Sequence, residues 1–375
     1  MNKAYKYRIY PTDAQQSLLL RTFGCCRKIY NLMLEVQKKS LDETGKLTSV
    51  TPAMFKQQYP FLREVDSLAL ANKQMDLQQA FKNFFDKKRK KRCRFPKFKS
   101  RKRCRRSYTT NNKNGTIEVL DKDIKLPKVG IIKAKIHRRA PEDWLLKSAT
   151  VSQERDGSFY VSVLYEYEAD IQPVPVSDNA IGLDYASDGL YVDEFNRKGT
   201  NHKFFCESQR KLAKAQRRLS RKKGYKKNEK KSQNYWRQLK KVNRIQRHIA
   251  NQRADNLHKI STEIANQYDV VCVETLNMQA MANKGVGNGK ATLDNGYGKF
   301  LVMLQYKLAE RGKHFVKIDK WFPSSQLCHQ CGTIHPEMKD LKVTNIVCDC
   351  GLTMNRNQNA AINIKREGLR TLMCA

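Results

Sequence analysis

Val270-Val271-Cys272-Val273-Glu274 is a run of four apolar residues that ends in an acid. A short apolar run of this kind is typical of a buried β-strand. The same pattern occurs earlier, where Ile181-Gly182-Leu183-Asp184 closes a strand over residues 180–184. Further strands are expected at residues 189–192 and 314–319, and helical patterns occupy residues 207–267 and 295–311. Strands that alternate with helices predict a mixed α/β sheet for this half of the chain.

The first half of the chain has a different pattern. Residues 3–10 alternate aromatic or aliphatic residues with basic ones, as a strand does, and short alternating runs resume from residue 95 to about residue 171. Residues 12–45 and 66–92 have helical periodicity instead, and prolines break the chain between them. We therefore expect antiparallel strands of a barrel or sandwich that are interrupted by a helical insert.

The expected organisation is multidomain α+β. A β domain takes residues 1–10 and 95–172, a helical insert takes 11–94, and an α/β domain takes 178–375, within which the last cysteines form a module at 325–352. Pro173-Val174-Pro175 is the expected linker between the two halves.

The charge of the chain points to a polyanionic partner. Lysine and arginine number 73 against 36 acidic residues, which gives a formal net charge of +37. The sequence has no run of about 18 or more apolar residues, and its N-terminus lacks the apolar stretch of a secretory signal. We therefore expect a nucleic acid as the partner, no membrane, and a cytoplasmic location in which thiols stay reduced.

Basic residues are concentrated in two segments. Residues 87–106 interleave lysine and arginine with Phe95, Pro96 and Phe98, and residues 210–253 carry a basic residue on most helical turns. The first segment would also fit a disordered basic tail or a localisation patch, but strand-forming sequence resumes directly after it, which favours phosphate binding. Such residues recognise charge and shape rather than base sequence. The candidate nucleic-acid-binding residues are Arg27, Lys97, Lys99, Arg101, Arg103, Arg217, Arg218, Arg221, Lys222, Lys240 and Arg247.

Four of the eleven cysteines have the spacing of metal ligands. Cys328 and Cys331 form one close pair, and Cys348 and Cys350 form another after a polar loop. Four thiolates on one zinc ion would leave no open coordination position, so a structural zinc site is predicted. Two alternatives are four reduced cysteines without metal and replacement of one ligand by His329 or His335.

The acids that end the two apolar strands are candidate ligands of catalytic metal ions. In an RNase H-like sheet, carboxylates on adjacent strands and on a following helix hold magnesium ions that activate water. Asp184 and Glu274 fit the strand positions. Each motif alone is weak, because an apolar strand often ends in an acid.

The order of these motifs is more specific than any one of them. After the cysteines comes Asn355-Arg356-Asn357-Gln358-Asn359-Ala360-Ala361, with a last helix expected from about Asn359. In this order the chain resembles TnpB, the transposon-associated RNA-guided nuclease related to compact type V CRISPR effectors, over nearly its whole length. Supporting stretches are Gly24-Cys-Cys-Arg27 with Tyr30-Asn31, and residues 65–71, 96–100, 107–111, 255–259 and 323–326.

The resemblance implies a fold, a set of partners and a catalytic triad. It implies an N-terminal wedge-like β-barrel with a helical insert, which would hold the guide RNA and read a short DNA motif beside a double-stranded target. It also implies a C-terminal RuvC-type, RNase H-like domain with an inserted zinc-binding module. Asp184 and Glu274 match the first two catalytic acids, whereas Asn357 stands where the family motif has the third, an aspartate.

Asparagine at this position predicts weak magnesium binding and severe loss of cleavage, because it is neutral and its amide directs donors at a cation. Guide and DNA binding would remain, so we expect a guided transcriptional repressor that associates with the nucleoid. Alternatives are an active guided endonuclease that recruits another acid such as Asp349, a laboratory substitution, a non-guided transposon DNA-binding protein and an RNA-binding scaffold. A tyrosine transposase is disfavoured, because no His-x-His cluster is present.

Overall fold

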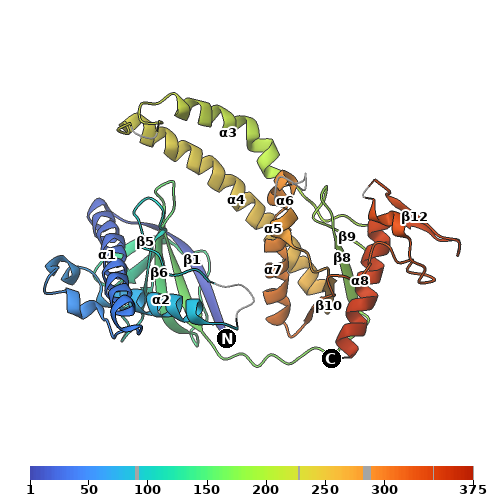
Figure 1. Cartoon of the computed structure of the whole chain (residues 1–375), viewed down its shortest axis with the longest axis horizontal. Coiled ribbons are helices and arrows are strands. Elements are labelled where there is room, and N and C mark those ends of the chain that lie inside the picture. Colours follow the sequence, from blue (N-terminus) through green and yellow to red (C-terminus); the bar gives the residue numbers. More distant parts are fainter. Residues whose placement is uncertain (89–92, 227–228, 282–288, 341, 375) are drawn as a thin grey trace. The chain divides into compact units, whose positions relative to one another are not determined.

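The structure of the chain is a computed structural model, and it describes all residues except 89–92, 227–228, 282–288, 341 and 375. It divides into two compact units, Met1–Ala169 and Asp170–Ala375 (Figure 1). Residues 89–92 of the predicted basic segment lie outside the described residues. No helix in the described part is both long and apolar enough to cross a bilayer.

A seven-stranded antiparallel sheet forms the centre of the first unit. Its strands are β1 (Asn2–Tyr10), β2 (Arg106–Asn111), β3 (Glu118–Val119), β4 (Asp123–Leu126), β5 (Gly130–Lys135), β6 (Leu145–Gln153) and β7 (Phe159–Glu166). The order is β2-β6-β7-β1-β5-β4-β3, so the first strand joins the later ones, as predicted. Because β2 and β3 are the two edges of this order, the strand pairing does not confirm the predicted barrel.

Helices cover this sheet and share its core. They are α1 (Asp13–Thr44), α2 (Ser67–Phe85) and two 3₁₀ turns, η1 (Pro52–Phe55) and η2 (Pro60–Arg63). Helix α1 begins at a capping box formed by Thr12 and Gln15 and ends at Gly45, whose positive φ of 68° suits glycine. Leu19 and Ile29 of α1 are buried in the same core as Tyr7 of β1. The helical insert and the sheet therefore fold as one body.

A four-stranded sheet forms the centre of the second unit. Its strands are β8 (Ala180–Tyr185), β9 (Tyr191–Asp193), β10 (Val270–Val273) and β11 (His314–Lys317), in the order β11-β10-β8-β9. Strands β8, β10 and β11 are parallel, and β9 pairs antiparallel with β8. This confirms the mixed α/β sheet predicted from the apolar runs.

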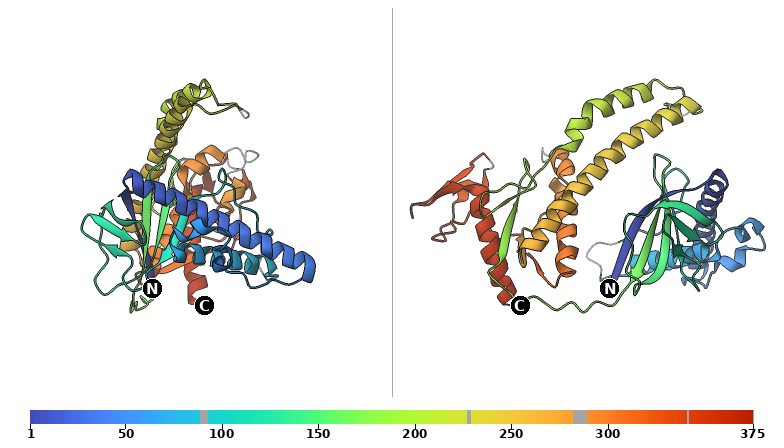
Figure 2. Two further views of the ribbon diagram at one scale, coloured as in Figure 1. Left: turned by 90° about the vertical axis from the view of Figure 1, so that its left-hand side faces the viewer. Right: turned by 180° about the vertical axis from the view of Figure 1, so that it is seen from behind.

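The two faces of this sheet are covered by different helices. Ile181, Leu183, Val271 and Val273 pack into one core with α4 (Gln233–Gln267) and α7 (Tyr297–Ala309). The alternate residues Ala180, Val270 and Cys272 pack on the opposite side with Ile364 of α8 (Arg356–Met373). Figure 1 and Figure 2 show the sheet between α7 and α8. A strand residue therefore faces α8 if its number is even and faces α4 and α7 if it is odd.

Helix α8 lies so close to β8 that only glycine fits between them. A Cβ atom added at Gly182 would lie 2.0 Å from the carbonyl oxygen of Ala361. We predict that Gly182→Ala destabilises the chain by about 2 kcal/mol or more, because backbone atoms must move apart. Gly24→Ala in α1 is the control, since a Cβ there would meet no atom within 4 Å. Equal denaturant midpoints for the two variants would contradict this packing.

The prediction of one long helical stretch at residues 207–267 is wrong, because the chain forms two helices there. The structure has two helices, α3 (Phe204–Ser220) and α4, which run side by side as a hairpin (Figure 1). Gly224 in the turn has a φ of +93°, and the Ser232 hydroxyl caps α4. Leu212 and Leu219 of α3 pack against Val242 of α4. We call residues 204–253 the basic hairpin.

The last helix also begins earlier than predicted. Helix α8 starts at Arg356 rather than near Asn359, because the Asn355 side chain accepts hydrogen bonds from the backbone N–H groups of Asn357 and Gln358. The remaining elements of this unit are α5 (Met278–Met281), α6 (Gly289–Asn295), η4 (Pro336–Lys339), β12 (Asn345–Val347) and β13 (Thr353–Asn355).

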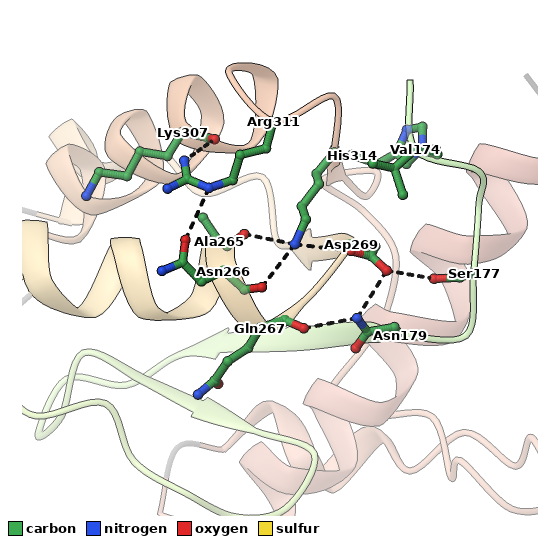
Figure 3. Close-up of polar contacts among 11 residues, drawn as sticks. Val174, Ser177, Asn179, Ala265, Asn266, Gln267, Asp269, Lys307, Arg311 and His314 are labelled. Carbon is green, nitrogen blue, oxygen red and sulfur yellow. Dashed lines mark hydrogen bonds and ion pairs between the residues drawn. The ribbon is translucent and has the colours of Figure 1, made fainter. Parts of the chain in front are cut away.

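The predicted linker is attached to the second unit. Val174 donates a backbone hydrogen bond to Gly312 at 2.9 Å, and its carbonyl oxygen lies 2.7 Å from Nε2 of His314. Asp269 accepts hydrogen bonds from Ser177 and Asn179 and forms an ion pair with Lys313 (Figure 3). These contacts fix the path of the chain into β8.

Candidate functional site

The structure brings Asp184 and Glu274 together. Leu183 and Val273 are register partners on the parallel strands β8 and β10, and each acid follows directly. Both acids have even numbers, so the strand alternation directs both side chains to the α8 face. Asp184 is 8% exposed, and Glu274 is half-buried. We call these two residues the acidic pair.

Burial and mutual repulsion disfavour the charged form of the acidic pair. The pKa of Asp184 is raised well above its ordinary value, chiefly by burial and then by the Glu274 carboxylate. Burial also raises the pKa of Glu274. A hydrogen bond from the Ser324 hydroxyl and the guanidinium of Arg356 lower this pKa, but by less than burial raises it. The positive charge of Arg356 also lowers the pKa of Asp184 and so offsets part of the increase. The pair is therefore a site that favours cations.

Asn357 lies on the part of α8 that covers these strands. Ala361 contacts β8 at Gly182, and Asn357 is one helical turn earlier on the same face. The neighbouring residue, Arg356, is close enough to act on the pKa of both acids. Among the described residues the Asn357 side chain has no hydrogen-bond partner, whereas Asn355 is occupied in capping the helix.

These donors fit a magnesium ion. Two carboxylates on adjacent strands supply the hard oxygen ligands that Mg²⁺ prefers, and this ion is commonly held by one or two carboxylates plus water. A site for two ions would be one carboxylate short, because Asn357 contributes no charge.

The raised pKa values predict that the acidic pair destabilises the metal-free protein at neutral pH. A carboxyl whose pKa is raised by folding contributes stability below its unfolded pKa and loses it as pH rises through the folded pKa. In magnesium-free buffer without a chelator, Asp184→Asn should therefore raise the melting temperature at pH 7.5. The expected increase is about 2–4 °C for each kcal/mol of repulsion and burial cost that the substitution removes, and it should be smaller at pH 5.

Asp188→Asn is the matched control with the opposite sign. A 2.6 Å hydrogen bond from Lys198 lowers the pKa of Asp188, so its charge is stabilising above its unfolded pKa. That variant should melt slightly lower at pH 7.5. Thermal melts at both pH values measure the difference, and a lower melting temperature for Asp184→Asn would contradict the proposed repulsion.

The four predicted zinc ligands also meet in the structure. The sulfur atoms of Cys328, Cys331, Cys348 and Cys350 all lie within 4.8 Å of one another. Sγ of Cys328 is 3.6 Å from that of Cys350, and Sγ of Cys331 is 3.4 Å from that of Cys348. Tetrahedral zinc with Zn–S bonds of about 2.3 Å places sulfur atoms about 3.8 Å apart, so the cluster fits zinc. Hydrogen bonds with Thr333 lower the pKa of Cys331, whereas burial and the neighbouring cysteine side chains raise the pKa of Cys350 to about 12.

Three residues that the sequence did not single out as site residues connect the cysteines to the acidic pair. Ser324, four residues before Cys328, donates a hydrogen bond to Glu274. Asn359 of α8 accepts from the backbone and the ring of His329, and Asn363 donates to the carbonyl oxygens of Ser324 and Leu327. Asparagine at positions 359 and 363 thus ties the start of the cysteine module to α8.

Arg356 and Tyr297 were also missed. The Arg356 guanidinium donates to the backbone carbonyls of Met338 and Asp340 at 3.3 and 3.1 Å, so it joins the cysteine module to the site. Tyr297 is fully buried, and its pKa is raised well above the ordinary value by burial and by Asp184. The family motif contains Arg356, but no sequence pattern gives its contacts.

The predicted nucleic-acid-binding residues fall into two groups, one in each unit. In the first unit, Lys97, Arg101 and Arg103 are exposed, and Arg27 on α1 is half-buried. Lys99 is half-buried, with its ammonium 3.5 Å from the ring centre of Tyr30 and its backbone held by the side chain of Asn31. Lys99 is thus fixed in place by the fold.

In the second unit the candidates lie on the basic hairpin. Arg217, Arg218, Arg221, Lys222 and Lys240 are exposed, and Arg247 is half-buried. Within the part of the chain that the structure describes, none of the five exposed residues has a carboxylate partner. Their charge is therefore available to an external anion.

A relative with similarity over the full length decides the family. The chain is 35% identical over 392 residues to a "Putative RNA-guided DNA endonuclease" of Streptomyces pristinaespiralis, covering 100% of this chain and 91% of the relative. The chain belongs to the TnpB family. A second relative, "Putative RNA-guided DNA endonuclease InsQ" of Escherichia coli K12, is 29% identical over 99% of this chain and 94% of its own length. The resemblance seen in the motifs is thus confirmed.

Family models match three parts of this TnpB chain. They are described as a helix-turn-helix domain at residues 1–46, a probable transposase at 162–285 and a Cas12f1-like TNB domain at 297–364. Residues 1–46 form strand β1 and the single helix α1, so the description helix-turn-helix does not match the geometry there. The third model covers the cysteine module and the start of α8.

A solved structure has the same fold as this TnpB chain. The cryo-EM structure of a Cas12f1–sgRNA–target DNA complex matches with a TM-score of 0.51 and 12% identity, over 97% of this chain and 98% of the other. The mixed α/β, multidomain fold class is thereby supported.

Proposed function

We propose that this TnpB-family chain is an RNA-guided DNA-binding protein whose nuclease activity is lost or strongly reduced, and that it acts as a guided transcriptional repressor. The observation that carries the proposal is Asn357 on the face of α8 that covers the intact acidic pair. Its neutral amide replaces the carboxylate expected from the family motif, so the site keeps its shape but lacks one charge.

The proposed partners are a guide RNA and double-stranded target DNA with a short adjacent motif. Two full-length relatives are described as RNA-guided DNA endonucleases, and the Cas12f1 structure contains sgRNA and target DNA. The exposed cations of the basic hairpin and of residues 97–103 supply the phosphate contacts that such partners need. Base pairing with the guide would then supply the sequence specificity.

In this proposal the second unit is a RuvC-type, RNase H-like domain. Asp184 and Glu274 would hold magnesium, which when bound activates water and stabilises the leaving oxygen. Ser324 orients Glu274 through its hydrogen bond, and Arg356 offsets part of the negative charge. Cys328, Cys331, Cys348 and Cys350 would hold one structural zinc ion. The first unit would be the wedge-like domain that holds the RNA scaffold.

An active guided endonuclease is the second candidate function. It is favoured by retention of both strand acids, the buried Asp184 and the half-buried Glu274, whose carboxylates suit one magnesium ion. Asp349, which would be a replacement ligand, is exposed in the turn between Cys348 and Cys350. A non-guided DNA-binding protein would make no use of the acidic pair.

The deciding experiment compares binding and cleavage of plasmids by the protein loaded with a guide RNA. We expect tight binding of a matched plasmid, no magnesium-dependent cutting, and repression of a reporter promoter that carries the target. A scrambled guide should abolish both binding and repression. Cleavage of the matched plasmid would instead show an active endonuclease. Binding that ignores the guide, with no discrete RNA copurifying, would show a non-guided protein.

A further inference from the structure

Trp321 is exposed to an unusual degree for its residue type. Its relative exposure is 81%, the largest among the large hydrophobic side chains that the structure describes. Tryptophan usually buries most of its ring, since an indole offers a large apolar area and one hydrogen-bond donor. An exposed indole beside a lysine is a candidate contact for a partner that stacks on aromatic rings and carries negative charge.

The loop that carries Trp321 is held in place on both sides. The Asp319 carboxylate accepts the backbone N–H of Trp321 at 2.7 Å, and the Thr275 hydroxyl donates to the carbonyl oxygen of Ile318 at 2.7 Å. The next residue, Phe322, packs into the core beneath α8. The exposure of Trp321 is thus a feature of an ordered loop.

This loop leads directly to the acidic pair. Ser324 follows Trp321 by three residues and donates a hydrogen bond to Glu274. Consecutive Cα atoms are about 3.8 Å apart, so the Cα atoms of Trp321 and Ser324 are separated by at most about 11 Å. That span corresponds to about three stacked nucleotides of one strand. A strand with a phosphate at the acidic pair would therefore have bases within reach of Trp321.

The charge around the ring favours a nucleic acid over an apolar protein segment. The Lys320 ammonium lies 4.3 Å from the centre of the Trp321 ring. An aromatic face beside a cation suits a base with its adjacent phosphate. The net charge of +37 likewise favours a negatively charged partner for the chain as a whole.

We propose that Trp321 is a stacking site for one unpaired nucleobase of the strand that passes the acidic pair, with Lys320 binding the adjacent phosphate. The inference rests on the proposed function for the identity of that strand. Stacking on an indole tolerates any base, because every base has a π-face. The site would position a strand at the nuclease fold whether or not the strand is cut.

Photocrosslinking of the unaltered protein is the first test. A single-stranded oligodeoxythymidine that contains 5-iododeoxyuridine at successive positions should crosslink to the peptide containing Trp321, as identified by mass spectrometry. Crosslinks confined to other peptides, including the one with the half-exposed Trp236, would overturn the proposal.

Two variants at the same position separate stacking from hydrophobic contact. Trp321→Leu should weaken binding of the oligonucleotide by about 5- to 150-fold, because one stacked base contributes about 1–3 kcal/mol. Trp321→Tyr should keep most of the affinity, because it retains an aromatic face. An abasic nucleotide at the crosslinking position should remove the difference between the wild type and Trp321→Leu. Equal losses for Leu and Tyr would contradict stacking.

The test does not depend on a guide RNA, so the two proposals can fail separately. If the guided complex forms but Trp321 neither crosslinks nor affects strand binding, the stacking site is wrong and the proposed function stands. If Trp321 crosslinks but a matched guide confers no target binding, the stacking site stands and the guided function is wrong.

Discussion

Asn357→Asp should give the RNA-loaded protein magnesium-dependent cleavage of a matched DNA target, at a rate about 100-fold or more above that of the unmodified protein. The expected gain follows from the charge that one carboxylate adds to a metal site, which is worth several kcal/mol in the transition state. The substitution needs little rearrangement, because asparagine and aspartate have nearly the same shape and the Asn357 side chain has no hydrogen-bond partner among the described residues. Plasmid nicking and linearisation measure the rate.

Asn355→Asp is the matched control for this prediction. The family motif has aspartate at both positions, but the Asn355 side chain caps α8 instead of facing the acidic pair. Aspartate is an equally good cap, so this variant should fold normally and remain inactive. Adding Glu274→Gln to Asn357→Asp should abolish the regained cleavage. Normal target binding by Asn357→Asp without any cutting would show that more than one carboxylate is missing.

Loss of zinc should unfold the cysteine module. Its core is small, comprising Cys328, Met338, Ile346 and Cys348, so metal ligation has to supply most of its stability. We predict that Cys348→Ser lowers the zinc content from about one ion per chain to near zero, because a site with three thiolates binds zinc far more weakly. Metal analysis gives the stoichiometry directly.

The same variant should disturb the acidic pair. Residues 324–329 are held by Asn359 and Asn363, and Ser324 contacts Glu274, so hydrogen exchange should accelerate through 324–355 and at the start of α8. Cys206→Ser is the control, since Cys206 is an exposed free thiol on α3. Unchanged zinc content in Cys348→Ser, or protection retained through the module, would argue against a four-cysteine site.

The sequence predicts the strands of this protein better than its helix boundaries. The apolar runs that end in Asp184 and Glu274 lie on adjacent parallel strands, because an unbroken apolar run is a strong and local signal. The break in the basic hairpin was missed, since the helical pattern on both sides concealed Gly224 and the Ser232 cap. The sequence likewise does not reveal that Asn355 caps α8, because this residue belongs to a stretch that resembles a catalytic motif.

The contacts that complete the site join residues that are far apart in the sequence. Ser324 lies 50 residues from Glu274 along the chain, and Asn359 lies 30 residues from His329. Only the packing of α8 across Gly182 brings these residues to one edge of the sheet. No periodicity or spacing rule predicts such contacts, although the stretches that contain them were recognised as family motifs.

The intact acidic pair beside Asn357 also has a genetic consequence. Every asparagine codon differs from an aspartate codon in its first base alone, so one A-to-G transition converts Asn357 to aspartate in a site that already presents the other two acids. If the guided target lies on the host chromosome, such a revertant would cut its own genome and be eliminated. If the proposed loss of cleavage holds, selection against such revertants would then maintain it.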